Sequence, residues 1–187
     1  ATMADGSQLI GQHLITGKEC EPISSPITRL QLSGSSAELQ PATPHISADI
    51  TRLINSAELI CYPPGSFYSS LIAALLPQGV AEAVSLSPAP KVFIPNLGSD
   101  PEQFGMDMIG ALEKLIEYLG GRNIELGKLL NYVVVDPRIG NQAIATLTSV
   151  LEPKHIQLLC LPEQLNYHDG YYDPDELAKA LTTLAVR

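Results

Sequence analysis

The chain has 187 residues and a formal net charge of −9, with 20 Asp and Glu residues against 11 Lys and Arg. This length is typical of one domain, and we expect a single α/β domain over residues 1–187. No cluster of Lys and Arg is present that could neutralise phosphates, so we expect no nucleic-acid partner. No apolar stretch approaches the roughly 20 residues that cross a bilayer, which excludes a helical membrane span.

Charged residues make up only 17% of the chain, against about 25% in a typical domain. The low content predicts surface that is buried in a partner, either a second copy in a homo-oligomer or a further part of the same protein. Cys20, Cys61 and Cys160 are odd in number and widely spaced, and the last two lie in apolar runs typical of buried strands. We therefore expect reduced thiols and a cytoplasmic protein.

The first turn signal is Asp5-Gly6, a pair typical of a two-residue hairpin turn, followed by a plausible strand from Ser7 to Ile15. Almost no residues precede the turn, so we expect an N-terminal β-hairpin remnant on the C-terminal part of a longer protein. A native disordered start is the alternative. Residues 20–45 are rich in Pro, Ser and Thr without a period, which predicts an irregular connector with one short strand at Thr28–Leu32.

From Ser47 onward, helical and strand patterns alternate. Ser47 is a good N-cap for a helix whose apolar positions include Ile50, Leu53 and Ile54. Strands are expected at Leu59–Tyr62, Lys91–Ile94, Tyr132–Val135 and Ile156–Leu161, and helices at Leu71–Leu76, Val80–Val84, Met106–Leu119, Ala143–Leu151 and after the N-cap Asp173. This order predicts a doubly wound, mainly parallel, Rossmann-like sheet with helices on both faces. Ligands of such sheets bind beyond the carboxyl ends of the strands.

The loop after the first of these strands, Tyr62–Ser70, combines a Gly with several small hydroxyl residues. Gly65 lets the backbone approach a ligand, the hydroxyls of Ser66, Ser69 and Ser70 can bond phosphate oxygens, and the following helix offers free amides at its N-terminus. The pattern predicts an anion site. Ordinary capping by Ser69 or Ser70 after a proline turn fits the spacing equally well.

The segments Asn55–Ile60, Pro64–Ser70, Leu75–Pro77 and Lys91–Asn96 resemble the family that includes 2-phospho-L-lactate transferase and the nucleotide-sugar-binding YvcK-like regulators. The opening Ala4-Asp5-Gly6 and the segment Gly11–Glu19 are similar to the CofD-like branch of the bacterial GAK system. This resemblance covers most of residues 1–119.

The resemblance implies that the loop holds the diphosphate of a nucleotide ligand, such as a guanosine diphosphate ester. The ligand-binding residues that it implies are Gly65, Ser66, Tyr68, Ser69 and Ser70, with Asn96 at the mouth of the cleft. In the transferase a phospholactyl group passes from lactyl diphosphoguanosine to a deazaflavin precursor, so magnesium is implied as cofactor. The family's Gly-rich nucleotide loop and Asp-rich catalytic segment belong to an N-terminal half, so no catalytic residue is assigned in this chain.

The chain departs from the family pattern at two places. Tyr62-Pro63 replaces a small Gly residue, and Leu97–Glu102 replaces a segment of the regulators that contains Thr and Gln. The identity of the ligand therefore stays open. We expect the nucleotide-diphosphate-binding part of a CofD-like transferase, and the alternative is a regulator of the YvcK-like type that binds a nucleotide or nucleotide sugar without turnover. A purely structural or oligomerisation module is a third possibility.

Two further candidates lie outside the loop Tyr62–Ser70, one before it and one after it. His13 alternates with apolar residues and would point into a cleft, with Lys18 nearby as a counter-charge for phosphate, although a solvated strand histidine is the favoured interpretation. Asp100 and Glu102 follow a strand end and could reach a metal, but Ser99–Glu102 is also an ordinary turn or helix start, which we favour.

Two candidates lie in the C-terminal third. Arg138 in Asp136-Pro137-Arg138 is placed to clamp a phosphate, and a surface turn is equally compatible. Tyr167–Tyr172 sets a His and an Asp among aromatic residues, an arrangement suited to stacking a ring or contacting a partner subunit. No nucleophile matches the pair, so a catalytic dyad is disfavoured. No Cys and His spacing predicts a metal site in this chain.

Overall fold

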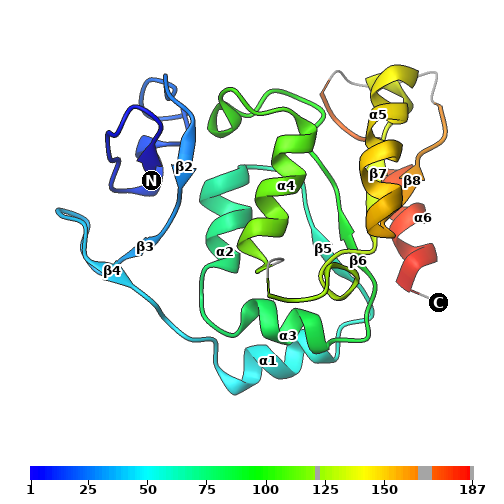
Figure 1. Cartoon of the computed structure of the whole chain (residues 1–187), viewed down its shortest axis with the longest axis horizontal. Helices are drawn as coiled ribbons and strands as arrows, with labels where there is room; N and C mark the ends of the chain where they lie inside the picture. The colour runs from blue at the N-terminus through cyan, green and yellow to red at the C-terminus, as the bar shows by residue number, and fades with distance from the viewer. Residues whose placement is uncertain (121–122, 164–169, 186–187) are drawn as a thin grey trace.

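The computed structural model describes residues 1–120, 123–163 and 170–185. Its centre is a four-stranded parallel sheet in the order β5 (Ile60–Tyr62), β6 (Lys91–Phe93), β7 (Tyr132–Val135) and β8 (Gln157–Cys160) (Figure 1). The strands pair in register through contacts such as Cys61 with Val92 and Phe93 with Val133. The expected parallel α/β sheet is confirmed, with each strand within one or two residues of its predicted place.

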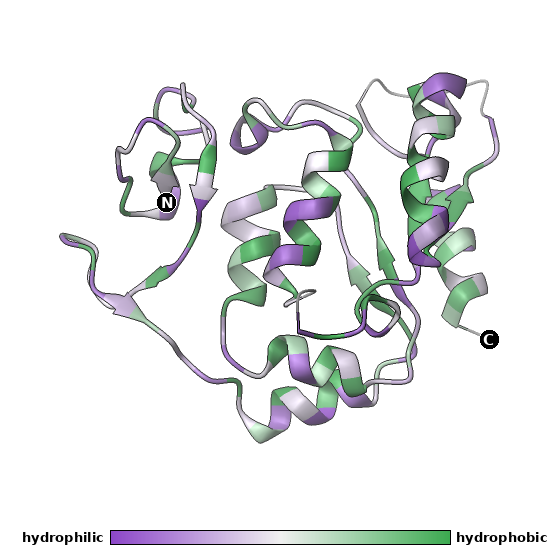
Figure 2. Cartoon of the chain, in the orientation of Figure 1, coloured by the Kyte–Doolittle hydropathy of each residue, from purple (hydrophilic) through white to green (hydrophobic). Residues whose placement is uncertain are grey.

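Most of the connecting helices pack on one face of the sheet. They are a π-helical turn (Phe67–Ile72), α2 (Ala73–Leu75), α3 (Val80–Leu86), α4 (Met108–Tyr118) and α5 (Asn141–Leu151). The large core joins Phe93 and Val133 of the sheet to Leu115 of α4 and Leu147 of α5. Apolar residues at helical spacing give each longer helix one apolar side, and this side packs on the sheet and buries its face. Figure 2 shows the two sides of α4, one green and one purple.

The opposite face of the sheet is covered by α6 (Pro174–Ala185). Val92 and Val134 point to this side, where they belong to one apolar cluster with Leu181 and Leu184. Because successive strand residues face opposite sides of a sheet, Phe93 and Val92 serve different cores. Helices therefore lie on both faces as expected, and the strand order follows the chain order without a reversal.

Two predicted N-caps, Ser47 and Asp173, are confirmed by their side-chain hydrogen bonds. The hydroxyl of Ser47 accepts from the amide of Ile50 at the start of α1 (Ala48–Asn55), and Asp173 accepts from the amides of Asp175 and Glu176 at the start of α6. The apolar side of α1 is only partly covered, because Leu53 remains 65% exposed.

The N-terminal segment differs from its prediction. The Asp5-Gly6 turn forms, with the amide of Met3 donating to the carbonyl of Ser7 over 2.9 Å, but a strand from Ser7 to Ile15 does not. Only Gln8 bridges to Thr2, and a 3-10 turn follows at Gln12–Leu14. The reason is that β1 (Thr2–Met3) is too short to pair along nine residues and takes β2 (Ile27–Arg29) as its partner.

The connector is also more ordered than expected. In place of one strand at Thr28–Leu32, residues 20–45 contain β2, β3 (Leu32–Ser33) and β4 (Pro41–Ala42), and the last two pair antiparallel with each other. The segment lies beside α2 and α4 (Figure 1) and contributes Ile23, Ile27 and Leu30 to the large core.

The expected burial of Cys61 and Cys160 is wrong, since all three cysteines are free and exposed. Cys61 lies on β5 and Cys160 on β8, which are the edge strands of the sheet and are each paired on one side only. An apolar run thus marked a strand correctly but not its position in the sheet. Among the described residues, no helix is long and apolar enough to cross a membrane.

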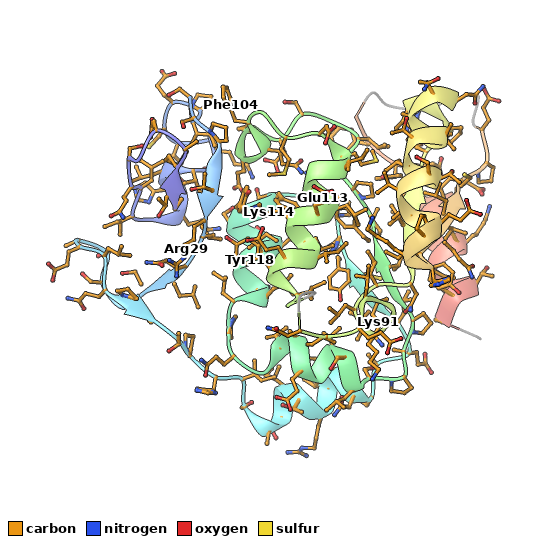
Figure 3. All side chains as sticks on the ribbon, in the orientation of Figure 1. Arg29, Lys91, Phe104, Glu113, Lys114 and Tyr118 are labelled. Carbon is orange, nitrogen blue, oxygen red and sulfur yellow. The ribbon has the colours of Figure 1, made fainter. Side chains whose placement is uncertain are left out.

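Two tyrosine hydroxyls attach the connector, residues 20–45, to the helices that cover the sheet. The amide of Leu30 donates to the hydroxyl of Tyr118 on α4 over 2.6 Å, and Figure 3 shows Tyr118 beside Arg29 of β2. The hydroxyl of Tyr68 instead donates to the carbonyl of Ile27 over 3.1 Å.

We expect Tyr118→Phe to lower the free energy of unfolding by about 1 kcal/mol, because the amide of Leu30 loses its partner in a partly buried place. Urea unfolding followed by circular dichroism measures the change. Tyr132→Phe is the matched control, since no hydrogen bond of the Tyr132 hydroxyl occurs among the described residues. Equal effects of the two substitutions would contradict the role given to Tyr118.

Candidate functional site

A cavity of about 780 Å³ lies beyond the carboxyl ends of β5 and β6, where the sheet topology predicts a ligand. Its walls come from the loop after β5, the loop after β6, Lys18 of the N-terminal segment and the residues around the start of α6. Gly65, Ser66 and Asn96, three of the residues implied by the family resemblance, line this cavity together with Ser99 and Asp100.

Asn96 ties the two loops of the cavity together. Its side-chain oxygen accepts from the amide of Gly65 over 2.8 Å, and its side-chain nitrogen donates to the carbonyl of Gly65 over 2.8 Å. The same nitrogen lies 3.2 Å from a carboxylate oxygen of Asp100. Because both hydrogen bonds go to one residue, Asn96 fixes the approach of the β5 loop to the β6 loop.

Two carboxylates occupy the amides that were expected to bind a ligand. Asp100 accepts from the amide of Phe67 over 2.8 Å, and Glu102 accepts from the amides of Tyr68 and Ser69 over 2.7 Å each. Glu102 also accepts from the Ser69 hydroxyl and is only 1% exposed. The expectation of free amides at Phe67–Ser69 is therefore wrong, because the chain supplies its own anions to this helix N-terminus.

The first turn of this helix is wide. The amides of Ser70 and Leu71 both donate to the carbonyl of Ser66 over 3.2 Å. The bond from Leu71 spans five residues, which is the hydrogen-bond pattern of a π-helix. The side chain of Tyr68 is fully buried, and Tyr68 and Ser69 do not line the cavity. Ser70 is exposed and lines, with Ser66, a separate apolar cavity of about 340 Å³.

The donors that remain for a ligand lie beside the expected ones. Within the described chain, the amides of Ser66, Gly98 and Ser99 have no hydrogen-bond partner, and all three residues line the large cavity. The amino group of Lys18 lies 3.5 Å from the Ser66 hydroxyl. Lys18 is the one cationic side chain among the described residues of the lining. The sequence signal was Gly98-Ser99 after β6, but Ser99 was interpreted as part of a turn or helix start at Ser99–Glu102, and Gly98 only as part of a departure from the family pattern.

The structure agrees with the favoured interpretation of His13 as a solvent-exposed histidine, although His13 does not lie in a strand. His13 is exposed in the 3-10 turn and does not line the cavity. Among the described residues, no group of three His, Cys, Asp or Glu side chains could hold a metal ion. Tyr167, His168 and Asp169 lie outside the described residues.

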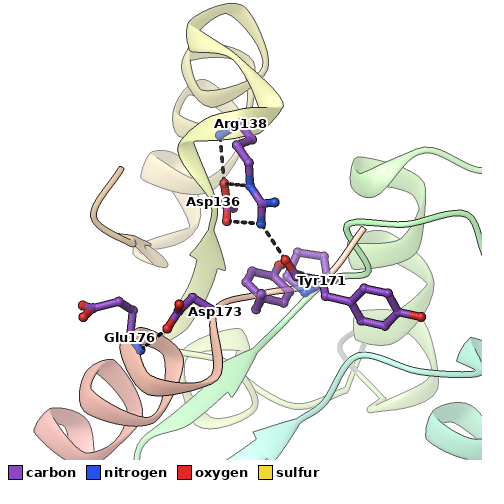
Figure 4. Close-up of polar contacts among 7 residues, drawn as sticks. Asp136, Arg138, Tyr171, Asp173 and Glu176 are labelled. Atoms are coloured by element: carbon purple, nitrogen blue, oxygen red, sulfur yellow. Dashed lines mark hydrogen bonds and ion pairs between the residues drawn. The ribbon is translucent and has the colours of Figure 1, made fainter. Parts of the chain in front are cut away.

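Arg138 pairs with Asp136. The guanidinium donates to both carboxylate oxygens over 2.8 and 2.7 Å, and it also donates to the carbonyl of Tyr171 over 2.6 Å (Figure 4). The hydrogen bond from Arg138 is the main cause that lowers the pKa of Asp136. Arg138 therefore links the β7 loop to the segment before α6, which makes the turn interpretation the better one.

Comparisons with known proteins agree on a family. The family model described as "2-phospho-L-lactate transferase CofD" matches residues 1–156. A Deinococcus radiodurans protein described as "Putative gluconeogenesis factor" is 31% identical over 121 residues, which cover 64% of this chain and 24% of that protein. A Yersinia pestis protein of the same description is 28% identical over 137 residues, covering 72% of this chain and 43% of its own length.

A solved structure has the same fold. A member of the UPF0052 family from Bacillus halodurans superposes with a TM-score of 0.66 at 20% identity, over 96% of this chain and 57% of the other. The chain thus spans less than two thirds of the length of each of these three proteins.

We expect Glu102→Ala to lower the free energy of unfolding by about 3 kcal/mol, because two amides and a hydroxyl lose a charged acceptor in a buried place. Urea unfolding measures the loss, and Glu113→Ala, an exposed change on α4, is the control. An effect of Glu102→Ala within about 0.5 kcal/mol of the control would contradict the capping role.

The lowered pKa of Asp136 leads us to expect that the free energy of unfolding depends on pH. Since its folded pKa is lowered, its contribution is complete above the ordinary value of about 3.9 and is lost as the pH falls through the folded pKa. We expect Asp136→Asn to destabilise the protein by about 1 kcal/mol at pH 7 and by less at pH 3. Urea midpoints at both pH values test this, with Glu58→Gln as control, because Glu58 is exposed and makes no hydrogen bond or ion pair within the described residues. A penalty that does not shrink at low pH would contradict it.

Proposed function

Because the chain belongs to the CofD family of 2-phospho-L-lactate transferases, we propose that its large cavity binds the diphosphate of a nucleotide ligand. In this proposal the chain is the nucleotide-binding part of a transferase that moves a phospholactyl or related group. The observation that carries it is that Ser66, Gly98 and Ser99, whose amides have no hydrogen-bond partner within the described residues, line one cavity together with Lys18.

The cavity supports an anionic ligand through three kinds of donor. The amides of Ser66, Gly98 and Ser99 have no partner within the described residues, and the hydroxyl of Ser66 and the amino group of Lys18 lie at the same place. Backbone amides in consecutive loop positions form concave anion sites, and a lysine adds a point charge. Gly65 and Asn96 shape the wall, and Asp100 holds it in position from behind through the amide of Phe67.

The described residues fit a protein-held magnesium ion poorly. Asp100 is the one carboxylate among the described lining residues, and its oxygens already accept from Phe67, Asn96 and Glu102. Magnesium usually needs one or two carboxylates in addition to phosphate oxygens. The proposal therefore assigns no step to a metal held by this chain.

A second function has support from the same observation. A cavity with anion donors, whose one described carboxylate is already hydrogen-bonded, suits binding without turnover, as in a regulator that senses a nucleotide or a nucleotide sugar. The two functions separate in one assay, in which the full-length protein is incubated with magnesium, lactyl diphosphoguanosine and the deazaflavin acceptor. Transfer of the phospholactyl group supports the transferase. Saturable binding of GDP without product supports the regulator.

We expect Lys18→Ala to weaken the affinity for GDP about fivefold or more, because the cavity loses its cationic side chain, and we expect the loss to shrink at high salt. Isothermal titration calorimetry at two salt concentrations measures both effects. Lys128→Ala is the matched control, since Lys128 is exposed and does not line the cavity. Saturable binding that is unchanged in Lys18→Ala would contradict the proposed position of the phosphates.

A further inference from the structure

One wall of the large cavity lies beyond the part of the chain that matches the family model. The match to the family model ends at residue 156, whereas Gly170, Tyr171 and Tyr172 line the cavity beside the loop that follows β6. Tyr171 is 73% exposed, which makes it the most exposed of the large apolar side chains in the described chain. Its ring has no aromatic partner within the described residues.

The backbone that carries Tyr171 is held at three points. Arg138 donates to the carbonyl of Tyr171 over 2.6 Å, and the hydroxyl of Tyr172 donates to the carbonyl of Pro95 over 2.7 Å. Gly170 meets Gly98 so closely that a Cβ atom added at Gly98 would lie 3.3 Å from the Gly170 carbonyl oxygen. The main chain is therefore fixed against both the β6 loop and the β7 loop.

This arrangement fixes the backbone of an aromatic residue while leaving its ring available. A tyrosine offers a large, flat surface at a low cost in conformational entropy, because its side chain has only two rotatable torsions. Nucleotide bases stack on such rings, and the gain depends little on the identity of the base. The cavity lining thus includes the kind of side chain that a nucleotide base needs in addition to donors for its phosphates.

We propose that Tyr171 stacks on the planar base of a nucleoside diphosphate whose phosphates contact Lys18 and Ser66. This inference rests on the proposed function and deepens it, because it assigns the base side of the ligand to the segment before α6. It also makes Tyr171 a determinant of specificity for ligands that carry an aromatic ring over ligands that carry only the diphosphate.

The test compares a ligand with a ring and a ligand without one. Calorimetric affinities for GDP and for inorganic pyrophosphate are measured with the wild-type full-length protein and with Tyr171→Ala and Tyr171→Phe. We expect Tyr171→Ala to weaken GDP binding about tenfold and to leave pyrophosphate binding unchanged, while Tyr171→Phe keeps most of the GDP affinity. Phe104→Ala is the matched control, because Phe104 is an exposed aromatic residue that does not line the cavity.

The outcomes separate the inference from the proposed function. If GDP binds and Tyr171→Ala has no effect, the inference is overturned and the proposed function stands. A loss of both affinities to the same extent in Tyr171→Ala also overturns the inference, since it assigns Tyr171 to the shape of the loop. If the wild-type protein binds neither ligand, both proposals fail.

Discussion

The carboxylate of Glu102 decides the chemistry of this protein's candidate site. A helix N-terminus beside a parallel strand usually leaves amides free for an anion, and here Glu102 and Asp100 take those of Phe67, Tyr68 and Ser69. Burying an acidic side chain is costly unless its oxygens are hydrogen-bonded, and three donors meet that condition for Glu102. The hydrogen bonds at the helix start therefore connect the loop after β5 to the loop after β6.

Because the carboxylates occupy the amides of the helix start, the backbone amides that remain available to a ligand belong to neighbouring residues of the two loops. Ser66 precedes the capped turn, and Gly98 and Ser99 precede the capping carboxylates; within the described residues the amides of these three lining residues have no partner. The two loops can present these donors together because Asn96 and Asp100 hold them at a fixed separation. Capping and ligand binding are thus served by neighbouring residues of the same two segments.

The sequence predicted those features whose cause is local. The β-branched run of β7 was predicted to the residue, and the Asp173 cap of α6 followed from Asp-Pro with Glu three residues after the cap. The role of Glu102 was out of reach, because its partners Tyr68 and Ser69 are more than 30 residues away in the chain. The same limit explains Cys61 and Cys160, since composition marks a strand without telling whether it lies at the edge of a sheet.

The internal capping of the helix start has a consequence for the energetics of recognition. A loop whose helix start is already capped by Asp100 and Glu102 is ordered without a ligand, so little conformational entropy is lost on binding. The same order limits the range of ligands that the cavity can bind, because a ligand must match the existing spacing of Lys18, Ser66 and Ser99. The cavity should behave as a rigid receptor that rejects poorly matched molecules by shape.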